Sequence, residues 1–281
     1  MPPQPPQPRR VLTEIGEGVA IVGGYPALYL RDSDAVCIAD LHLGYEEALA
    51  EDSGIAVPSR QFEDVRRLLL AIVASASGRC AGSEPESELE PYETGGRKIS
   101  KLIINGDLKH VFSKASFQEW REVPKFVEFA SRFFEEIILV RGNHDTKLSP
   151  LRRYAVEVVS AHVEGDTLFS HGHSELDAEG FKNVVIAHEH PVLVLGDRIG
   201  ARVKLPCFLR GVLGDANLIV MPAFSPLAGG TPVNLVSNEE LLSPVIREVG
   251  LEEMEVFAVD EEAGVLSFPR LGEWRTVSLR L

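Results

Sequence analysis

KLIINGDLKH, residues 101–110, places an apolar run directly before a glycine, an aspartate and a histidine. A short apolar run bounded by turn residues is typical of a buried strand, so Lys101–Asn105 is predicted to be one. The polar segment Gly106–His110 begins where that strand ends. Ligand sites of open α/β sheets form at the carboxyl ends of strands, so this stretch predicts an α/β fold with functional side chains at a strand end.

The same arrangement recurs on both sides of this stretch. Asp34–Ala39 and Ile137–Val140 are also predicted to be buried strands, and each runs into a polar segment that contains glycine. The further motifs are DLHLG at 40–44, GNHD at 142–145, SHGH at 170–173 and AHEHP at 187–191. Each motif alone has a plain structural explanation, such as a turn or a surface histidine. All five motifs in this order, each after an apolar run, indicate one shared site.

The residue types in these motifs form a consistent set of metal ligands. They supply carboxylate, imidazole and amide groups and no thiolate, which suits a divalent ion such as Mn, Fe or Zn. Two ions about 3.5–4 Å apart, bridged by an aspartate, can clamp a phosphoryl group and activate a water between them. The motifs therefore favour hydrolysis of a phosphate ester by a metal-bridging hydroxide.

From Asp40 to His190 the sequence resembles the ordered set D-x-H, G-D-x-x-H, G-N-H-D, H-G-H and G-H-x-H of calcineurin-like metallophosphoesterases. KLPCF at 204–208 and MPAFSPLAGG at 221–230 are similar to segments of SbcD-related phosphoesterases of archaea and ligase-associated metallophosphoesterases of bacteria. The resemblance implies the metallophosphatase fold, a four-layer α/β/β/α sandwich of two mixed sheets flanked by helices.

The resemblance also implies a site with two divalent ions, with Mn expected first and Fe, Zn, Ni or Co as alternatives. The ligands would be Asp40, His42, Asp107 and His190 for one ion, and Asp107, Asn143, His171 and His188 for the other, with Asp107 as the bridge. His144 would stabilise the transition state or protonate the leaving oxygen. His110 and Arg141 would contact the substrate phosphate. His173 would support the ligands from outside.

Two departures refine this expectation. Ala187 stands where the last motif has glycine, and its methyl group is tolerated unless φ is positive there. Ser/Thr protein phosphatases look like GDxVDRG and GNHE, whereas this chain has GDLKH and GNHD. The resemblance therefore favours a phosphodiesterase, in the form of a nuclease or a DNA-repair enzyme, over a protein phosphatase.

Two alternatives stay open. One is a small-molecule phosphomonoesterase or nucleotidase. The other is a non-catalytic metal-binding scaffold, against which the presence of every ligand and of His144 argues. The expected partner is a phosphate-ester substrate, with nucleic acid and nucleotides as candidates.

Composition limits the class of protein. The 281 residues carry a formal net charge of −14, which disfavours a tight structural binder of DNA more than it disfavours an enzyme. Cys37, Cys80 and Cys207 are far apart and form no CxxC pair, so they are predicted to be reduced thiols. The sequence shows no targeting segment and no apolar run long enough for a bilayer, so a cytoplasmic protein without membrane contact is expected.

The chain is predicted to form one domain over residues 11–281. Residues 1–10 are Pro-rich and predicted to be a flexible tail, and the Glu- and Pro-rich stretch 81–97 is predicted to be an acidic surface loop. Hydrophobic periodicity predicts helices over Gln61–Ala76 with Ser59 as N-cap, over Phe117–Phe134 and over Glu239–Val249.

Overall fold

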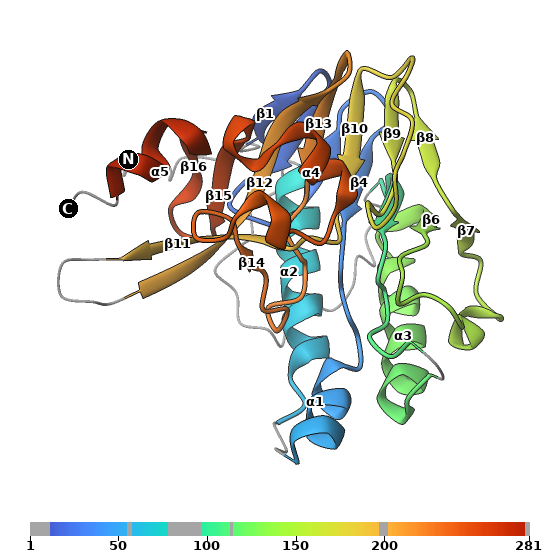
Figure 1. The fold of residues 1–281 in the computed structure, drawn as a ribbon. Coiled ribbons are helices and arrows are strands. Elements are labelled where there is room, and N and C mark those ends of the chain that lie inside the picture. Colours follow the sequence, from blue (N-terminus) through green and yellow to red (C-terminus); the bar gives the residue numbers. More distant parts are fainter. Residues whose placement is uncertain (1–11, 55–57, 78–96, 113–114, 197–201, 279–281) are drawn as a thin grey trace, which may run out of the picture.

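Two β-sheets packed face to face form the centre of the structure, and helices lie on their outer sides (Figure 1). The structure is a computed structural model, and it describes residues 12–54, 58–77, 97–112, 115–196 and 202–278. No helix in these ranges is both long enough and apolar enough to span a membrane.

The first sheet contains seven strands that follow one another across the sheet in chain order. Neighbours from β1 to β4 are antiparallel, and neighbours from β4 to β7 are parallel. The strands are β1 (Leu12–Gly16), β2 (Val19–Val22), β3 (Leu28–Leu30), β4 (Ala35–Ile38), β5 (Ile99–Asn105), β6 (Phe134–Val140) and β7 (Glu157–Val159). The carboxyl ends of β4, β5 and β6 therefore lie side by side.

The second sheet has the order β14-β11-β12-β13-β10-β9-β8, with β15 paired to β12 and β16 to β15. It is mixed, because β10 is parallel to β9 and β13 whereas β12 is antiparallel to β11, β13 and β15. The strands are β8 (His162–Glu164), β9 (Thr167–Phe169), β10 (Asn183–Ile186), β11 (Pro191–Gly196), β12 (Arg202–Leu213), β13 (Ala216–Val220), β14 (Thr231–Pro232), β15 (Glu255–Asp260) and β16 (Gly264–Arg270).

Alternate residues of the central strands belong to different hydrophobic cores. In β5, Leu102 and Ile104 face the core under the helices, and Ile103 faces the core between the sheets. In β13, Leu218 faces the outer core of the second sheet and Ile219 faces the core between the sheets. Side chains alternate along a strand, so a continuous apolar run signals burial on both faces. The predicted four-layer α/β/β/α sandwich of two mixed sheets is confirmed.

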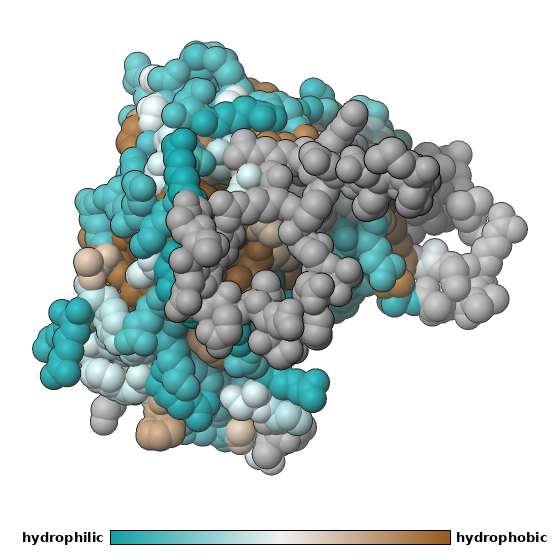
Figure 2. Space-filling view, turned by 180° about the vertical axis from the view of Figure 1, so that it is seen from behind, coloured by the Kyte–Doolittle hydropathy of each residue, from teal (hydrophilic) through white to brown (hydrophobic). Residues whose placement is uncertain are grey.

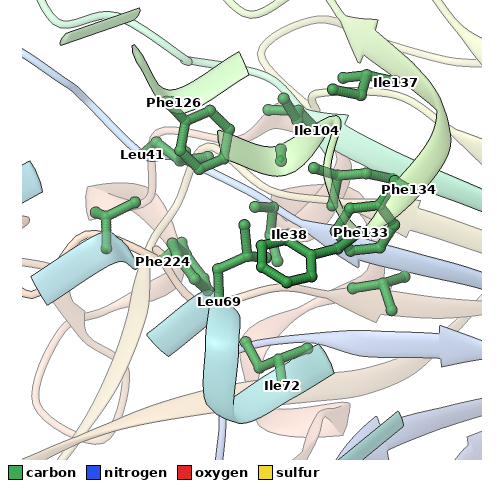
Figure 3. Packing of buried hydrophobic residues seen from close by; sticks show 14 of the residues in the cluster. Ile38, Leu41, Leu69, Ile72, Ile104, Phe126, Phe133, Phe134, Ile137 and Phe224 are labelled. Carbon is green, nitrogen blue, oxygen red and sulfur yellow. The ribbon is translucent and has the colours of Figure 1, made fainter. Parts of the chain in front are cut away.

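Helices cover the outer face of each sheet. In the core beneath α2 and α3, Leu69 and Phe126 meet Ile38 and Ile104 of the first sheet (Figure 3). Residues of α4 and α5 join the outer core of the second sheet. The α-helices are α1 (Tyr45–Ser53), α2 (Gln61–Ala76), α3 (Phe117–Ala130), α4 (Pro244–Val249) and α5 (Leu271–Ser278). The short 3₁₀ helices are η2 (Ser149–Leu151), η3 (Asn238–Glu240) and η4 (Leu251–Glu253).

Two of the predicted helices were wrong in their extent. The helix predicted over Phe117–Phe134 is α3, which ends at Ala130, because Phe134 begins β6 and pairs with β5. The predicted helix Glu239–Val249 is divided into η3 and α4, since Pro244 has no N–H with which to continue a helix that approaches it.

The predicted N-cap of α2 was also wrong. The capping position is Arg60 rather than Ser59, and its side chain forms no capping hydrogen bond. Oε1 of the buried Glu46 accepts the backbone N–H groups of Arg60 and Gln61 instead, at 2.6 and 2.9 Å. A carboxylate from α1 thus stabilises the start of α2.

Parts of the predicted organisation lie outside the described residues. These parts are the tail at 1–10 and all of the acidic loop at 81–97 except the exposed Arg97, so the single domain at 11–281 stays a prediction. Cys37 and Cys207 are buried free thiols. Hydrophilic residues cover most of the coloured surface in Figure 2, with hydrophobic residues visible between them.

Candidate metal centre

Five loops at the carboxyl ends of strands meet at one place. DLHLG follows β4, GDLKH follows β5, GNHD follows β6, SHGH follows β9, and AHEHP joins β10 to β11. The backbone N–H of His42 donates to the carbonyl of Asp107 at 2.9 Å. The backbone N–H of His188 donates to Oδ2 of Asp40 at 3.2 Å, which joins a loop of the second sheet to a loop of the first. The motifs separated in sequence therefore form one cluster.

Asp40, His42 and His190 form a first group, whose ligand atoms lie within 4.8 Å of one another. Nε2 of His190 lies 3.3 Å from Oδ2 of Asp40 and 3.3 Å from Nε2 of His42. Oδ2 of Asp107, the fourth residue predicted for this ion, lies 3.9 Å from Nε2 of His42. The structure thus brings together all four residues predicted around the first ion.

Asp107, His171 and His188 form a second group of the same dimensions. Nε2 of His171 lies 3.3 Å from Oδ2 of Asp107 and 3.0 Å from Oδ1 of Asn143. Nδ1 of His171 donates to the carbonyl of Asn105 at 3.1 Å, which leaves Nε2 to face the cluster. Oδ2 of Asp107 is therefore close to nitrogen atoms of both groups, as a bridging carboxylate would be.

The backbone is left-handed at five of the seven candidate ligands. The angle φ is 55° at Asp40, 47° at His42, 49° at Asp107, 70° at His188 and 50° at His190. Among the other described residues, Asp34 alone has a positive φ without being glycine. This conformation costs roughly 1–2 kcal/mol at such a residue and is concentrated at functional sites. The chain is strained where it aims side chains into the cluster.

Two motif glycines leave room for the candidate ligands. A Cβ atom on Gly106 would lie 2.0 Å from Nδ1 of His171, and one on Gly142 would lie 2.1 Å from Oδ1 of Asp107. Any larger residue at either position would displace a side chain of the cluster. Ala187, in place of the glycine of the last motif, does not have a positive φ, and its methyl group packs between the sheets.

The donor set fits divalent cations. Oδ1 of Asp40 is buried and has no hydrogen-bond partner among the described residues. A buried carboxylate oxygen without a partner is unfavourable unless a cation binds it. Nε2 of His42 and Nε2 of His190 also face each other at 3.3 Å, and two imidazole nitrogens turned together suit a shared cation.

Burial and neighbouring charges shift the pKa values of the cluster. Burial opposes a charge on His171, but its hydrogen bond to Asp107 and the charges of Asp40 and Asp107 outweigh burial and raise its pKa to about 9. Burial also opposes the carboxylate of Asp107, but His171 and His42 hold the pKa of Asp107 below its usual range. Burial lowers the pKa of His42 to about 3, and burial with the charge of His171 lowers that of His188 to about 4. The pKa of His190 is raised like that of His171, because the charge of Asp40 outweighs burial. Asp40 and Asp107 are thus ionised, and His42 and His188 are neutral, which are the forms that bind metal.

His144 lies beside the shared carboxylate in a fixed orientation. Its backbone N–H donates to Oδ1 of Asp107 at 2.9 Å, and its Nδ1 donates to the carbonyl of His110. The ring of Phe112 packs on its imidazole, with centroids 3.7 Å apart. Nε2 of His144 therefore remains available, 3.8 Å from Oδ2 of Asp107.

Of the other predicted site residues, His110 lies in the cluster, whereas His173 and Arg141 are exposed. His110 belongs to the cluster, since its Nδ1 lies 3.3 Å from Nδ1 of His42. His173 is exposed, with its ring centroid 5.4 Å from that of His171. The side chain of Arg141 is exposed, and no hydrogen bond or ion pair joins it to another described residue. The contact of Arg141 with a substrate stays a prediction.

Two further motif residues hold the loops together, although no role was assigned to them from the sequence. Asp145 is buried, and its carboxylate accepts the backbone N–H groups of Leu108 and Gly142 at 3.1 and 3.0 Å. Burial and the charge of Asp107 raise the pKa of Asp145 to about 7. Nζ of the buried Lys109 donates to the carbonyl of His144 at 2.6 Å. Their place inside GNHD and GDLKH was the only sequence signal.

Glu189 fastens the loop that carries the two candidate ligands on either side of it. Its side chain is buried, although its neighbours in the sequence are strained histidines. Oε1 accepts the hydroxyl of Thr231 at 2.8 Å, and Oε2 accepts the backbone N–H groups of Leu242 and Ser243 at 2.8 and 2.9 Å. These three bonds hold the loop against β14 and the segment that precedes α4.

Glu189→Ala is expected to lower the free energy of unfolding by about 1–3 kcal/mol, because the buried N–H of Ser243 and the part-buried N–H of Leu242 lose their acceptor. Urea unfolding followed by circular dichroism measures the change. The exposed Glu175 offers a matched control, and Glu175→Ala is expected to stay within about 0.5 kcal/mol of the unchanged protein. Equal stability of the two variants would contradict the fastening role of Glu189.

The family model described as Calcineurin-like phosphoesterase matches residues 35–211, more than half of the chain. The chain belongs to the calcineurin-like phosphoesterase family. The matched range contains all seven candidate ligands and His144. A calcineurin-like phosphoesterase is a metal-dependent hydrolase, and the histidine and aspartate groups of this chain are suited to hold metal. The predicted family and enzyme class are confirmed.

A solved structure shares the fold of this calcineurin-like phosphoesterase. The chain is similar to the nuclease MPE of Pseudomonas putida, with 20% sequence identity and a TM-score of 0.58. The likeness covers 92% of this chain and 98% of that one. No curated protein matches the sequence.

Proposed function

We propose that this chain hydrolyses phosphodiesters with two divalent ions, and that a nucleic acid or a nucleotide derivative supplies the diester. The observation that carries the proposal is that two ligand groups meet at Oδ2 of Asp107. The description of the Pseudomonas putida protein as a nuclease supports nucleic acid as the substrate class.

The ligand assignment follows the two groups. Asp40, His42 and His190 would hold the first ion, Asn143, His171 and His188 the second, with Asp107 shared between them. Two ions bound there would supply positive charge to the phosphoryl oxygens and lower the pKa of a water molecule.

The remaining residues would act on the substrate directly. Nε2 of His144 is available beside Asp107, so His144 would donate a proton to the leaving oxygen or a hydrogen bond to the phosphoryl group. The bond from its Nδ1 to the carbonyl of His110 would keep that orientation during the reaction. His110 and Arg141 would hold the phosphate.

Removal of metal tests the proposal. After treatment with a chelator and dialysis, the protein is expected to lose hydrolysis of bis-p-nitrophenyl phosphate, and added Mn²⁺ is expected to restore it. Release of p-nitrophenolate measures the rate, with Zn²⁺, Co²⁺, Ni²⁺ and Fe²⁺ in parallel. Undiminished turnover by protein shown to be free of metal would contradict metal-dependent hydrolysis.

The same assay with p-nitrophenyl phosphate separates the proposed activity from the phosphomonoesterase alternative. A higher kcat/KM for the diester is expected, and a higher value for the monoester would favour a phosphatase or nucleotidase. Manganese as the native metal, the kinship with SbcD-related proteins, a DNA-repair role and the cytoplasmic location stay predictions.

A further inference from the structure

A cavity of about 460 Å³ opens beside the candidate metal centre. His190, a candidate ligand of the first ion, is part of its wall. The volume falls within the range of pockets that bind small organic ligands, about 300–1,000 Å³. The cavity is therefore close enough to the candidate metal centre to hold another part of a substrate whose phosphate lies at the metals.

Two sequence segments without a role in the proposed hydrolysis meet at this cavity. Lys204, Leu205 and Pro206 of KLPCF form one side, and residues 222–229 of MPAFSPLAGG form another. The first segment belongs to β12 and the second follows β13, so the second sheet supplies both. Both segments therefore have the same structural role, which is to form the wall of this cavity.

The second segment is attached directly to the loop that bears Asp40. The backbone N–H of Phe224 donates to the carbonyl of Ala39 at 2.7 Å, and that of Ser225 donates to the carbonyl of Asp40 at 3.2 Å. Nε2 of Gln61 donates to Oγ of Ser225 at 3.0 Å. The ring of Phe224 lies in the core near Leu69 (Figure 3). These contacts therefore fix the position of this part of the cavity wall relative to the candidate metal centre.

The chemistry of the lining is mostly apolar. Prolines, leucines, valines, alanines and Phe224 together make up most of it, including Pro26, Pro206 and Leu68. Such walls suit a flat, uncharged organic group better than a second phosphate.

Among the residues that the structure describes, Lys204 is the one charged residue of the cavity wall that forms no ion pair or side-chain hydrogen bond. Arg67 forms two hydrogen bonds to Glu261, at 2.6 and 2.9 Å. Oδ1 of Asp260 accepts the N–H groups of its own turn. Lys204 is exposed, and none of the described ion pairs includes it. Its ammonium group can donate to carbonyl or ether oxygens of a bound group.

We propose that this cavity binds the nucleoside of a phosphodiester whose phosphate lies at the metal centre, with Lys204 as a polar contact. The inference rests on the proposed function, because it assigns part of the same substrate. It also predicts substrate specificity: the enzyme would hydrolyse a diester that bears a nucleoside in preference to a diester that bears a small alkyl group.

Two diesters with the same leaving group test this inference. Thymidine 5′-(p-nitrophenyl phosphate) carries a nucleoside and methyl p-nitrophenyl phosphate carries a methyl group, and both release p-nitrophenolate. The unchanged protein is expected to favour the nucleoside diester by about tenfold or more in kcat/KM, through a lower KM. Ala228→Trp, which places a large ring in the cavity, is expected to reduce that preference to about onefold to threefold.

Matched variants and a binding measurement complete the experiment. Lys204→Met removes the charge and is expected to reduce the preference by about threefold to tenfold. Arg202→Met on the same strand and Ala161→Trp in the exposed turn between β7 and β8 do not alter the cavity lining and are expected to keep the preference unchanged.

Calorimetry of the metal-loaded protein with thymidine 5′-monophosphate and with inorganic phosphate reports binding without turnover. Ala228→Trp is expected to weaken binding of the nucleotide more than binding of phosphate.

The outcomes separate the two proposals. Hydrolysis of neither diester by metal-loaded protein would contradict the proposed function itself. Hydrolysis of both with equal kcat/KM, or an equal effect of Ala228→Trp on both, would overturn the cavity inference and leave the phosphodiesterase proposal standing.

Discussion

Asp107→Ala is expected to reduce hydrolysis of bis-p-nitrophenyl phosphate by about a thousandfold or more and to lower the metal content of the purified protein. The reason is geometric. Oδ2 of Asp107 lies 3.3 Å from Nε2 of His171 and 3.9 Å from Nε2 of His42, so one carboxylate serves both ligand groups. Release of p-nitrophenolate and elemental analysis of metal measure the two effects.

A second substitution separates chemistry from folding. Oδ1 of Asp107 accepts the backbone N–H of His144, and the side-chain oxygen of Asp107→Asn preserves an acceptor while removing the charge. This variant is expected to fold and to remain inactive. Asp215→Ala is the matched control, since Asp215 also follows a glycine with positive φ but is exposed in the turn between β12 and β13. If Asp107→Asn were about as active as Asp215→Ala, the proposal that Asp107 is the shared ligand would be contradicted.

His144→Gln is expected to lower kcat by about a hundredfold to ten-thousandfold for a diester with an alkyl leaving group, while the metal content stays unchanged. An alkoxide leaves only with a proton, and Nε2 of His144 is the available nitrogen beside the shared carboxylate. p-Nitrophenolate leaves without a proton, so the loss with aryl diesters is expected to be much smaller. The comparison of the two leaving groups measures proton donation.

The same experiment distinguishes the two roles predicted for His144. An equal loss with alkyl and aryl leaving groups would exclude proton donation and favour stabilisation of the phosphoryl charge. His162→Gln provides a control, because His162 lies in β8 and pairs with Glu164 at 3.1 Å, apart from the loops that carry the candidate ligands. A full rate for His144→Gln with both leaving groups would contradict either role.

The strands that carry the site could be predicted from the sequence because they are buried on both faces. Segments such as Leu102–Ile104 then read as continuous apolar runs, and the polar residues after them mark the strand ends. The long strand β12 was not predicted, since it begins with exposed residues and contains Pro206. Helix α1 was not predicted because Glu46 is its single buried residue and no apolar face signals it.

The candidate ligands could be proposed from motifs, whereas the residues that support them could not. Glu189 and Asp145 lie among the candidate ligands in the sequence, yet their partners at Leu242, Ser243 and Leu108 are backbone groups that no motif reveals. The cavity beside His190 likewise depends on distant segments packed together. Contacts of this kind follow from the tertiary fold and leave no pattern in the sequence.

The candidate ligands come from both sheets, and this has a consequence for folding. Asp40, Asp107 and Asn143 follow strands of the first sheet, whereas His171, His188 and His190 follow strands of the second. Neither half of the chain can assemble the full set of candidate ligands until the two sheets have docked, so an ion held by this set would bind the native state much more strongly than the unfolded one. By thermodynamic linkage, metal in the proposed site would act as a removable cross-link between the halves of the sandwich.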